Sequence, residues 1–219
     1  MRRRLIIVAR APLPGRVKSR LAADIGERAA AGVYARFLYA TLLDLARSDL
    51  EGIDIHLSIA SADDAPIFVD AFPEFNVTVQ PPGDLGDRLA AAFEEAFRAG
   101  VEAAVVIATD VPDLDAAVVR DGFRALHRAP GVIGPCYDGG YYLLGLRAPG
   151  ANLFHGVDWG TDRVLAQTER LAEDAGVRLE RLPPLLDLDT GEDVAAWVRS
   201  LGRDADSGTA GSTPGGTTT

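Results

Sequence analysis

Three positively charged side chains stand close together near the start of the chain: Arg16, Lys18 and Arg20. Lys18 is the only lysine among 22 basic residues, the others all being arginine. A lysine ammonium is a compact point charge that can sit against a phosphate oxygen without imposing the fork geometry of a guanidinium. Gly15 and an expected helix start are adjacent, and the amides at a helix start attract anions. The segment predicts an anion clamp, the alternative being that these side chains simply face water.

The motif PGRVKSRL, residues 14–21, differs from two familiar phosphate-binding loops. It contains Lys18 and Ser19 but lacks the glycines of GxxxxGK followed by Ser or Thr, and the chain has no GxGxxG. We therefore expect its cations, rather than its backbone amides, to do most of the phosphate binding.

A carboxylate follows the apolar run AAVVI: Asp110, within ATDVPDLD at residues 108–115. A carboxylate at the end of a buried strand is costly unless it is paired or binds a cation, and Mg²⁺ takes carboxylate oxygens together with substrate phosphates. Asp110 is therefore the first predicted metal ligand. Asp115 has the alternative role of a helix N-cap, and a part for Asp113 in the metal site is left open.

A second acidic segment lies near the end of the chain, LLDLDTGED at residues 185–193. Its apolar residues alternate with Asp187 and Asp189, which places both carboxylates on one face of an extended segment. Like charges at that spacing repel, so a nearby cation is the simplest explanation. Asp189 is the second predicted metal ligand, whereas the role of Asp187 is left open. Thr190 and Asp193 read more simply as a helix cap.

Two glycine-rich segments allow either ligand binding or a plain turn. In CYDGGYYLLG, residues 136–145, two glycines beside Asp138 let the main chain approach a ligand, but the same letters are hairpin signals. In QPPGDLGDR, residues 80–88, the loop can position a nucleotide or merely turn the chain. Cys136 has no histidine near it in sequence, so we expect no thiol nucleophile.

The elements around these motifs alternate between strand and helix, which is typical of an α/β fold. In an open α/β sheet, ligands bind outside the carboxyl ends of the strands, where the motifs above lie. Strands are expected at 5–9, 53–60, 77–80, 103–108, 132–135 and 141–146, and helices at 20–31, 27–47, 65–72, 85–99, 116–128, 161–175 and 192–201.

Composition limits the classes of partner. The chain has 219 residues and a net charge of −10, yet its first 20 residues hold seven basic side chains and no acidic one. Positive charge is thus local, which argues against nucleic acid and anionic membranes and favours a small anionic ligand. One cysteine and no long apolar run favour a reducing cytoplasm. We expect one domain at 1–202 and a disordered low-complexity tail at 203–219.

Six ordered motifs, PGRVKSRL, QPPGDLGDRL, ATDVPDL, GPCYDGGYYLLGL, DWGTDRVL and DLDTGEDV, span about residues 4–200. In this order they resemble an uncharacterised bacterial family of the nucleotide-diphospho-sugar transferase superfamily, often labelled an arsenosugar-biosynthesis-type glycosyltransferase. The family is similar to molybdenum-cofactor and phospholactate guanylyltransferases. The resemblance implies a single GT-A-like α/β domain with a mostly parallel mixed sheet flanked by helices.

The resemblance also implies roles for individual residues, matched position by position. It assigns nucleotide and phosphate binding to Arg16, Lys18, Arg20, Gln80, Gly83 and Asp84. It assigns the metal to Asp110 and Asp189, and the acceptor side to Gly139, Gly140, Tyr141, Trp159 and Thr161. Lys18 and Asp138 are the predicted catalytic residues, Asp138 as general base.

The implied activity is a transferase that uses a nucleotide-activated donor and Mg²⁺ or Mn²⁺, with a small-molecule acceptor. A glycosyltransferase acting from a nucleotide sugar is the first expectation. The alternatives are a nucleotidyltransferase that moves a nucleoside monophosphate from a triphosphate to a phosphorylated or hydroxyl acceptor, and a nucleotide-binding module without catalysis. Three cations in one loop suit a triphosphate, whereas the family label favours glycosyl transfer. The oligomeric state is not predicted.

Overall fold

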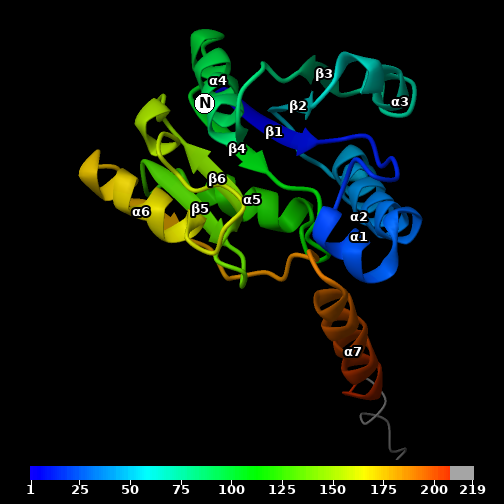
Figure 1. The fold of residues 1–219 in the computed structure, drawn as a ribbon. Coiled ribbons are helices and arrows are strands. Elements are labelled where there is room, and N and C mark those ends of the chain that lie inside the picture. Colours follow the sequence, from blue (N-terminus) through cyan, green and yellow to red (C-terminus); the bar gives the residue numbers. More distant parts are fainter. Residues whose placement is uncertain (208–219) are drawn as a thin grey trace, which may run out of the picture.

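A seven-stranded sheet with the order β3-β2-β1-β4-β6-β5-β7 forms the centre of the protein in this computed structural model, which describes residues 1–207 (Figure 1). The strands are β1 (Arg3–Ala9), β2 (Ile53–Ile59), β3 (Asn76–Val79), β4 (Ala103–Ile107), β5 (Gly131–Pro135), β6 (Tyr141–Leu146) and β7 (Leu179–Arg181). The helices are α1 (Ser19–Ile25), α2 (Glu27–Arg47), α3 (Ala65–Val69), α4 (Leu85–Arg98), α5 (Ala116–Ala125), α6 (Val164–Asp174) and α7 (Gly191–Ser207), with short 3₁₀ turns η1 (Ala62–Asp64) and η2 (Ala151–Leu153).

The sheet is mixed because of a single strand. Strand β6 runs antiparallel to both of its neighbours, β4 and β5, whereas all the other neighbouring pairs are parallel. A short loop joins β5 to β6, and two strands joined so closely can only pair antiparallel. The carboxyl ends of β1 and β4 therefore share one edge of the sheet with the start of β6.

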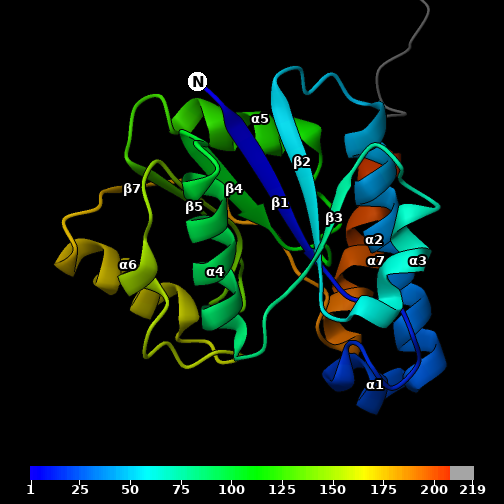
Figure 2. The same ribbon diagram turned by 90° about the horizontal axis from the view of Figure 1, so that it is seen from above.

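Helices cover both faces of the sheet, as the two views of the ribbon show (Figures 1 and 2). Side chains alternate along the central strands, because successive residues of a strand point to opposite faces. In β1, Leu5 and Ile7 pack into the cluster that contains α2 and α5, whereas Ile6 packs into the cluster that contains α4 and α6. The central strands are therefore apolar on both faces, as a doubly covered sheet requires.

The predicted α/β class and the mostly parallel mixed sheet are confirmed, and each of the six expected strands is present. Strand β7 was not expected. The helix expected at 20–31 is divided, because Gly26 adopts φ 86° between α1 and α2. Helix α7 continues to Ser207, beyond the end expected at residue 201. The boundary at residue 202 stays a prediction, and residues 208–219 of the expected tail lie outside the described residues.

None of the helices in the described part of the chain combines the length and the apolar character that a membrane span needs.

Candidate active site

The topology brings the cationic loop and both acidic segments to one edge of the sheet. Because β1 and β4 are parallel neighbours, the loops that follow them leave the sheet side by side. The late acidic segment joins them through a backbone hydrogen bond of 3.2 Å from Leu188 N to the Asp110 carbonyl. An isolated bridge between Cys136 and Leu185 ties the same segment to the end of β5. Residues more than 150 positions apart thus meet at this edge, as the 171-residue separation of Lys18 and Asp189 illustrates.

Lys18 lies between the two predicted metal ligands. Its Nζ donates to Asp110 Oδ2 at 2.6 Å and to Asp189 Oδ1 at 2.5 Å. The Lys18 side chain is 7% exposed, and each of the two carboxylates is 30% exposed. Burial by itself would lower the pKa of Lys18, but the charges of Asp110 and Asp189 outweigh it and the net pKa is raised. The ammonium is therefore charged at every physiological pH.

The backbone of Lys18 is held in a strained conformation. Its φ and ψ are 50° and 54°, and among the described residues it is the only non-glycine with positive φ. A left-handed conformation costs a lysine about 1 to 3 kcal/mol and persists only where the surroundings enforce it. The conformation occurs where the chain enters α1, and it accompanies the burial of the ammonium between the two carboxylates.

The two arginines of the loop have different partners. Arg20 reaches Asp189 Oδ2 at 3.5 Å and also donates to the Gly160 carbonyl. Arg16 instead forms an ion pair with the buried carboxylate of Asp64, at 3.1 Å. All three cations line one cavity, but only Lys18 and Arg20 contact a predicted metal ligand.

A second acidic group lies beside the Lys18 ion pairs. Ligand atoms of Cys136, Asp138 and Asp187 lie within 4.8 Å of one another. Burial, together with the charges of Asp138, Asp189 and Asp110, raises the pKa of Asp187 to about 7. Burial and the charge of Asp187 also raise the pKa of the Cys136 thiol, which is therefore neutral and a poor nucleophile.

The carboxylates of Asp110 and Asp189 fit a hard divalent cation. They come from two separate segments, and carboxylate oxygens are the ligands that Mg²⁺ and Mn²⁺ prefer. The pair Asp110 and Asp189 already holds one cation, the ammonium of Lys18, between its oxygens. The position that the sequence predicts for a metal is thus one where the structure concentrates negative charge.

A cavity of about 660 Å³ opens in front of these groups. Its volume lies within the range of about 300 to 1,000 Å³ typical of sites for small molecules and cofactors. Lys18, Asp110 and Asp189 line one part of the cavity. The remaining lining includes Arg16, Arg20, Tyr34, Leu85, Leu89, Asp138, Gly140, Tyr141, Trp159, Gly160, Thr161 and Val164.

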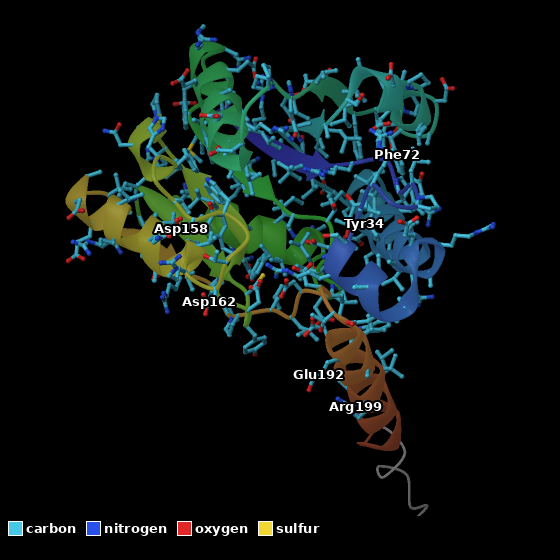
Figure 3. The ribbon with its side chains drawn as sticks, in the orientation of Figure 1. Tyr34, Phe72, Asp158, Asp162, Glu192 and Arg199 are labelled. Carbon is cyan, nitrogen blue, oxygen red and sulfur yellow. The ribbon has the colours of Figure 1, made fainter. Side chains whose placement is uncertain are left out.

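Aromatic and apolar side chains also line the cavity. The rings of Tyr141 and Trp159 meet edge to face, with centroids 6.4 Å apart. Leu85 and Leu89, on the first turns of α4, line the same cavity. Thr161, which also lines it, donates its hydroxyl to the carbonyl of Asp158, a residue labelled in Figure 3.

The DGGY segment is both a turn and part of the cavity. Asp138 accepts a 2.7 Å hydrogen bond from Gly140 N, which closes the turn, and both residues line the cavity. Gly139 has φ 89°, and a Cβ there would lie 2.1 Å from the Asp162 carbonyl oxygen. Gly139 therefore packs against the loop before α6 rather than lining the cavity, and its contribution is to let the two loops approach.

Three predicted nucleotide-binding residues lie outside the residues that line the cavity: Gln80, Gly83 and Asp84. Gln80 donates to the Ser58 carbonyl at 2.8 Å and accepts from Arg88. Asp84 forms a capping box with Asp87 at the start of α4. The side chains of Gln80 and Asp84 thus have partners within the protein. Contact of the three residues with a base or ribose stays a prediction.

Tyr34 is a cavity residue that the sequence did not single out. Its hydroxyl accepts from Arg10 N and pairs with Thr109 Oγ1, each at 3.2 Å. It therefore ties α2 to the loops after β1 and β4, the loops that carry Lys18 and Asp110. Figure 3 labels Tyr34 on α2. Its position on the buried face of α2 resembles that of an ordinary core aromatic, so spacing gave no signal of this contact.

Among solved structures, the fold resembles that of a protein provisionally assigned as a nucleotide-diphospho-sugar transferase. A provisionally assigned nucleotide-diphospho-sugar transferase from Desulfovibrio desulfuricans G20 is 29% identical, with a TM-score of 0.83. The match covers 94% of this chain and 96% of that one. The protein therefore has the nucleotide-diphospho-sugar transferase fold.

More distant structures share the fold only. The 4-diphosphocytidyl-2C-methyl-D-erythritol synthase of Anaerococcus prevotii DSM 20548 is 14% identical with a TM-score of 0.60, and the match covers 92% of this chain and 96% of that one. Rv0371c of Mycobacterium tuberculosis H37Rv, in a complex with manganese, is 16% identical with a TM-score of 0.55, and the match covers 91% and 100%.

The sequence itself places the chain in a family. Residues 43–161 match the family described as uncharacterized protein conserved in bacteria, DUF2064, and the chain belongs to this family. No curated protein matches the chain in sequence.

Proposed function

We propose that this protein is a divalent-metal-dependent transferase that uses a nucleotide sugar as donor and passes the sugar to a small acceptor. One observation carries the proposal. Lys18 Nζ lies within 2.6 Å of a carboxylate oxygen of Asp110 and of Asp189, and these three residues, from distant segments, all line a cavity of about 660 Å³. Cations and acidic metal ligands in one place are what the phosphates of a nucleotide and their counter-ion require. The likeness to the D. desulfuricans protein supports the same class.

Asp110 and Asp189 would hold the ion, and Asp187 lies close enough to act on the same charge. A bound Mg²⁺ or Mn²⁺ would neutralise charge on the leaving diphosphate. The manganese complex of Rv0371c, a protein of the same fold, supports a divalent ion here. Lys18 and Arg20 contact the predicted ligands from the cavity side and would bind the phosphates alongside them.

The acceptor would lie against Tyr141 and Trp159, which line the cavity. Trp and Tyr rings are good surfaces for a sugar or another flat, partly apolar molecule. Asp138 lines the same cavity, so its carboxylate can take a proton from an acceptor hydroxyl as general base. Its hydrogen bond from Gly140 N holds the carboxylate in place.

Nucleotidyl transfer from a triphosphate is the second candidate. The observation in its favour is that Arg16, Lys18 and Arg20 all line the cavity, because three cations suit the phosphates of a triphosphate. In that reaction the α-phosphorus is attacked and pyrophosphate leaves.

A panel of nucleotide sugars and nucleoside triphosphates, each with and without Mn²⁺, tests the proposal. Release of a nucleoside diphosphate from a nucleotide sugar supports glycosyl transfer, and release of pyrophosphate selects the second candidate. Binding without turnover for every donor and acceptor would leave a nucleotide-binding module and overturn the transferase proposal.

Variants identify the site in the same assay. Asp110→Asn and Lys18→Ala are each expected to lower turnover by about a hundredfold or more, as expected when electrostatic stabilisation of the leaving group is removed. The matched control is Asp121→Asn on α5, whose carboxylate, among the described residues, pairs only with Arg124 on the same helix and lies outside the cavity lining. Full activity of Asp110→Asn would contradict the metal role.

A further inference from the structure

We propose that Lys18 serves as an internal cation for Asp110 and Asp189, and that a divalent ion binds there only by displacing its ammonium onto the phosphates of the donor. The inference rests on the proposed function and adds an order of events to it. Ion and nucleotide would then bind together, because the nucleotide supplies the new partner for the displaced lysine.

The Lys18 ammonium already occupies the position that an ion between Asp110 and Asp189 would take. Lys18 Nζ lies 2.6 Å from Asp110 Oδ2 and 2.5 Å from Asp189 Oδ1. An Mg²⁺ ion bound to the same two oxygens would lie about 2.1 Å from each, within the volume that Nζ fills. Two cations cannot share that volume, so the ammonium must leave these oxygens for the ion to reach them.

In the present structure Lys18 links the two carboxylates. The ammonium is 7% exposed, and no other described side chain offers it a partner besides Asp110 and Asp189. Without a cation, the two carboxylates would repel each other across the joint between two distant segments. The lysine therefore keeps both ligands in place before any ion arrives, at the cost of occupying their oxygens.

The displaced lysine side chain has space to move into. Lys18 lines the 660 Å³ cavity, which lies in front of the ion pairs and holds the proposed phosphate site. After displacement Asp189 still faces the guanidinium of Arg20, at 3.5 Å. The exchange needs a rotation of the lysine side chain and no movement of the sheet.

The exchange predicts positive coupling between ion and phosphate. An ion that arrives alone must break both ion pairs of Lys18 and leave the ammonium without a partner. An ion that arrives with phosphates replaces those pairs with new ones, so the presence of either ligand strengthens binding of the other by the same factor. The simpler alternative is a permanent structural ion pair, with any ion bound elsewhere.

The single lysine of the chain makes the exchange directly observable. Protein grown with ¹³C,¹⁵N-lysine gives signals from a single lysine side chain, that of Lys18, and its Nζ signal is followed by NMR as Mg²⁺ and then pyrophosphate are added. We expect that signal to change little with Mg²⁺ alone and to shift when pyrophosphate is added with the ion. An unchanged Lys18 signal under conditions where the ion is bound at Asp110 would overturn the inference.

Binding of Mn²⁺, measured by electron paramagnetic resonance, supplies the second readout. Lys18→Met keeps a long unbranched side chain but removes the competing ammonium, so it should bind Mn²⁺ alone about tenfold more tightly than the wild type and lose the strengthening by pyrophosphate. Arg20→Met is the matched control, because it also removes a positive charge that contacts Asp189. Equal effects of the two substitutions would assign the change to net charge and overturn the exchange.

The failure of this inference differs from the failure of the proposed function. If Mn²⁺ binds and Asp110→Asn abolishes its binding while the lysine signal is unmoved, only the exchange is wrong. If Mn²⁺ does not bind with or without pyrophosphate, both the metal role and the exchange are wrong.

Discussion

Lys18 and Asp110 are 92 positions apart in the chain, yet Lys18 Nζ lies 2.6 Å from Asp110 Oδ2. The contact exists because β1 and β4 are parallel neighbours, so the loop after one strand lies beside the loop after the other. Parallel pairing at the centre of the sheet is thus what converts two separate sequence motifs into one charged site. The predictions below test how this site is supported and what it binds.

Asp187 should make the stability of the protein depend on pH. Burial, then the charges of Asp138, Asp189 and Asp110, raise its pKa from an ordinary 3.8 to about 7. The folded state therefore keeps this proton up to a higher pH than the unfolded chain. The stability that proton binding contributes is fully present below about pH 4 and is lost as the pH rises to about 7.

The substitution Asp187→Asn removes that titration. In metal-free buffer with a chelator, we expect the variant to gain on the wild type between pH 4 and pH 7, by about 1 kcal/mol or 2 to 4 °C in Tm after allowance for solvent screening. Above pH 7 the difference should level off. A difference in Tm that is constant from pH 4 to pH 8 would show that the Asp187 proton is not coupled to folding.

Gly139 should be indispensable to the loop that presents Asp138. Gly139→Ala combines a φ of 89° with a Cβ that would lie 2.1 Å from the carbonyl oxygen of Asp162. Asp162 is labelled in Figure 3. We expect a loss of about 3 kcal/mol or more in urea unfolding. Gly156→Ala is the control, because Gly156 has φ 74° but nothing within 4 Å of its Cβ position, so only about 1 to 2 kcal/mol is expected. Equal losses would mean that the packing against Asp162 does not matter.

Tyr34 should support both loops of the site through its hydroxyl. Tyr34→Phe removes hydrogen bonds to Arg10 N and Thr109 Oγ1, so we expect a loss of about 1 to 2 kcal/mol and weaker donor binding. Tyr39→Phe on the same helix is the control, because the Tyr39 ring stacks on that of Phe72, with centroids 6.3 Å apart, and its hydroxyl has no hydrogen bond among the described residues. Chemical denaturation and a donor titration measure both effects. Indistinguishable Tyr34→Phe and Tyr39→Phe variants would contradict the supporting role.

Trp159 should report on occupancy of the cavity. It lines the cavity, whereas Trp197, the other tryptophan, packs edge to face on Phe37 of α2, with ring centroids 5.0 Å apart. In a Trp197→Phe background, we expect acceptor or donor binding to change the fluorescence of Trp159. In a Trp159→Phe background, the same ligand should leave the emission of Trp197 unchanged. A response confined to Trp197 would place the ligand outside this cavity.

The six strands other than β7 were predictable from the sequence, because each lies in a short, largely apolar run bounded by turn residues. Strand β7 was not, because Leu179–Arg181 contains one large apolar residue, and its pairing is set by the free edge of β5. The proximity of Lys18, Asp110 and Asp189 was predictable because these residues follow strand ends or alternate with apolar residues, whereas their role as a site stays a prediction.

Other features of the site depend on contacts that no local pattern records. The spacing of the first loop predicts the same role for Arg16 and Arg20, but Arg16 pairs with Asp64, 48 positions away. Cys136 meets Asp187 only because the chain returns to bridge the end of β5 through Leu185.

The most direct test of the central claim is the binding of Mn²⁺ to the wild type and to Asp110→Asn and Asp189→Asn, in the presence of a nucleotide donor, measured by electron paramagnetic resonance. We predict one tight ion in the wild type, and affinity at least about tenfold weaker in each variant. Undiminished Mn²⁺ binding in both variants would contradict the account, because the ion would then lie away from the carboxylates that Lys18 joins.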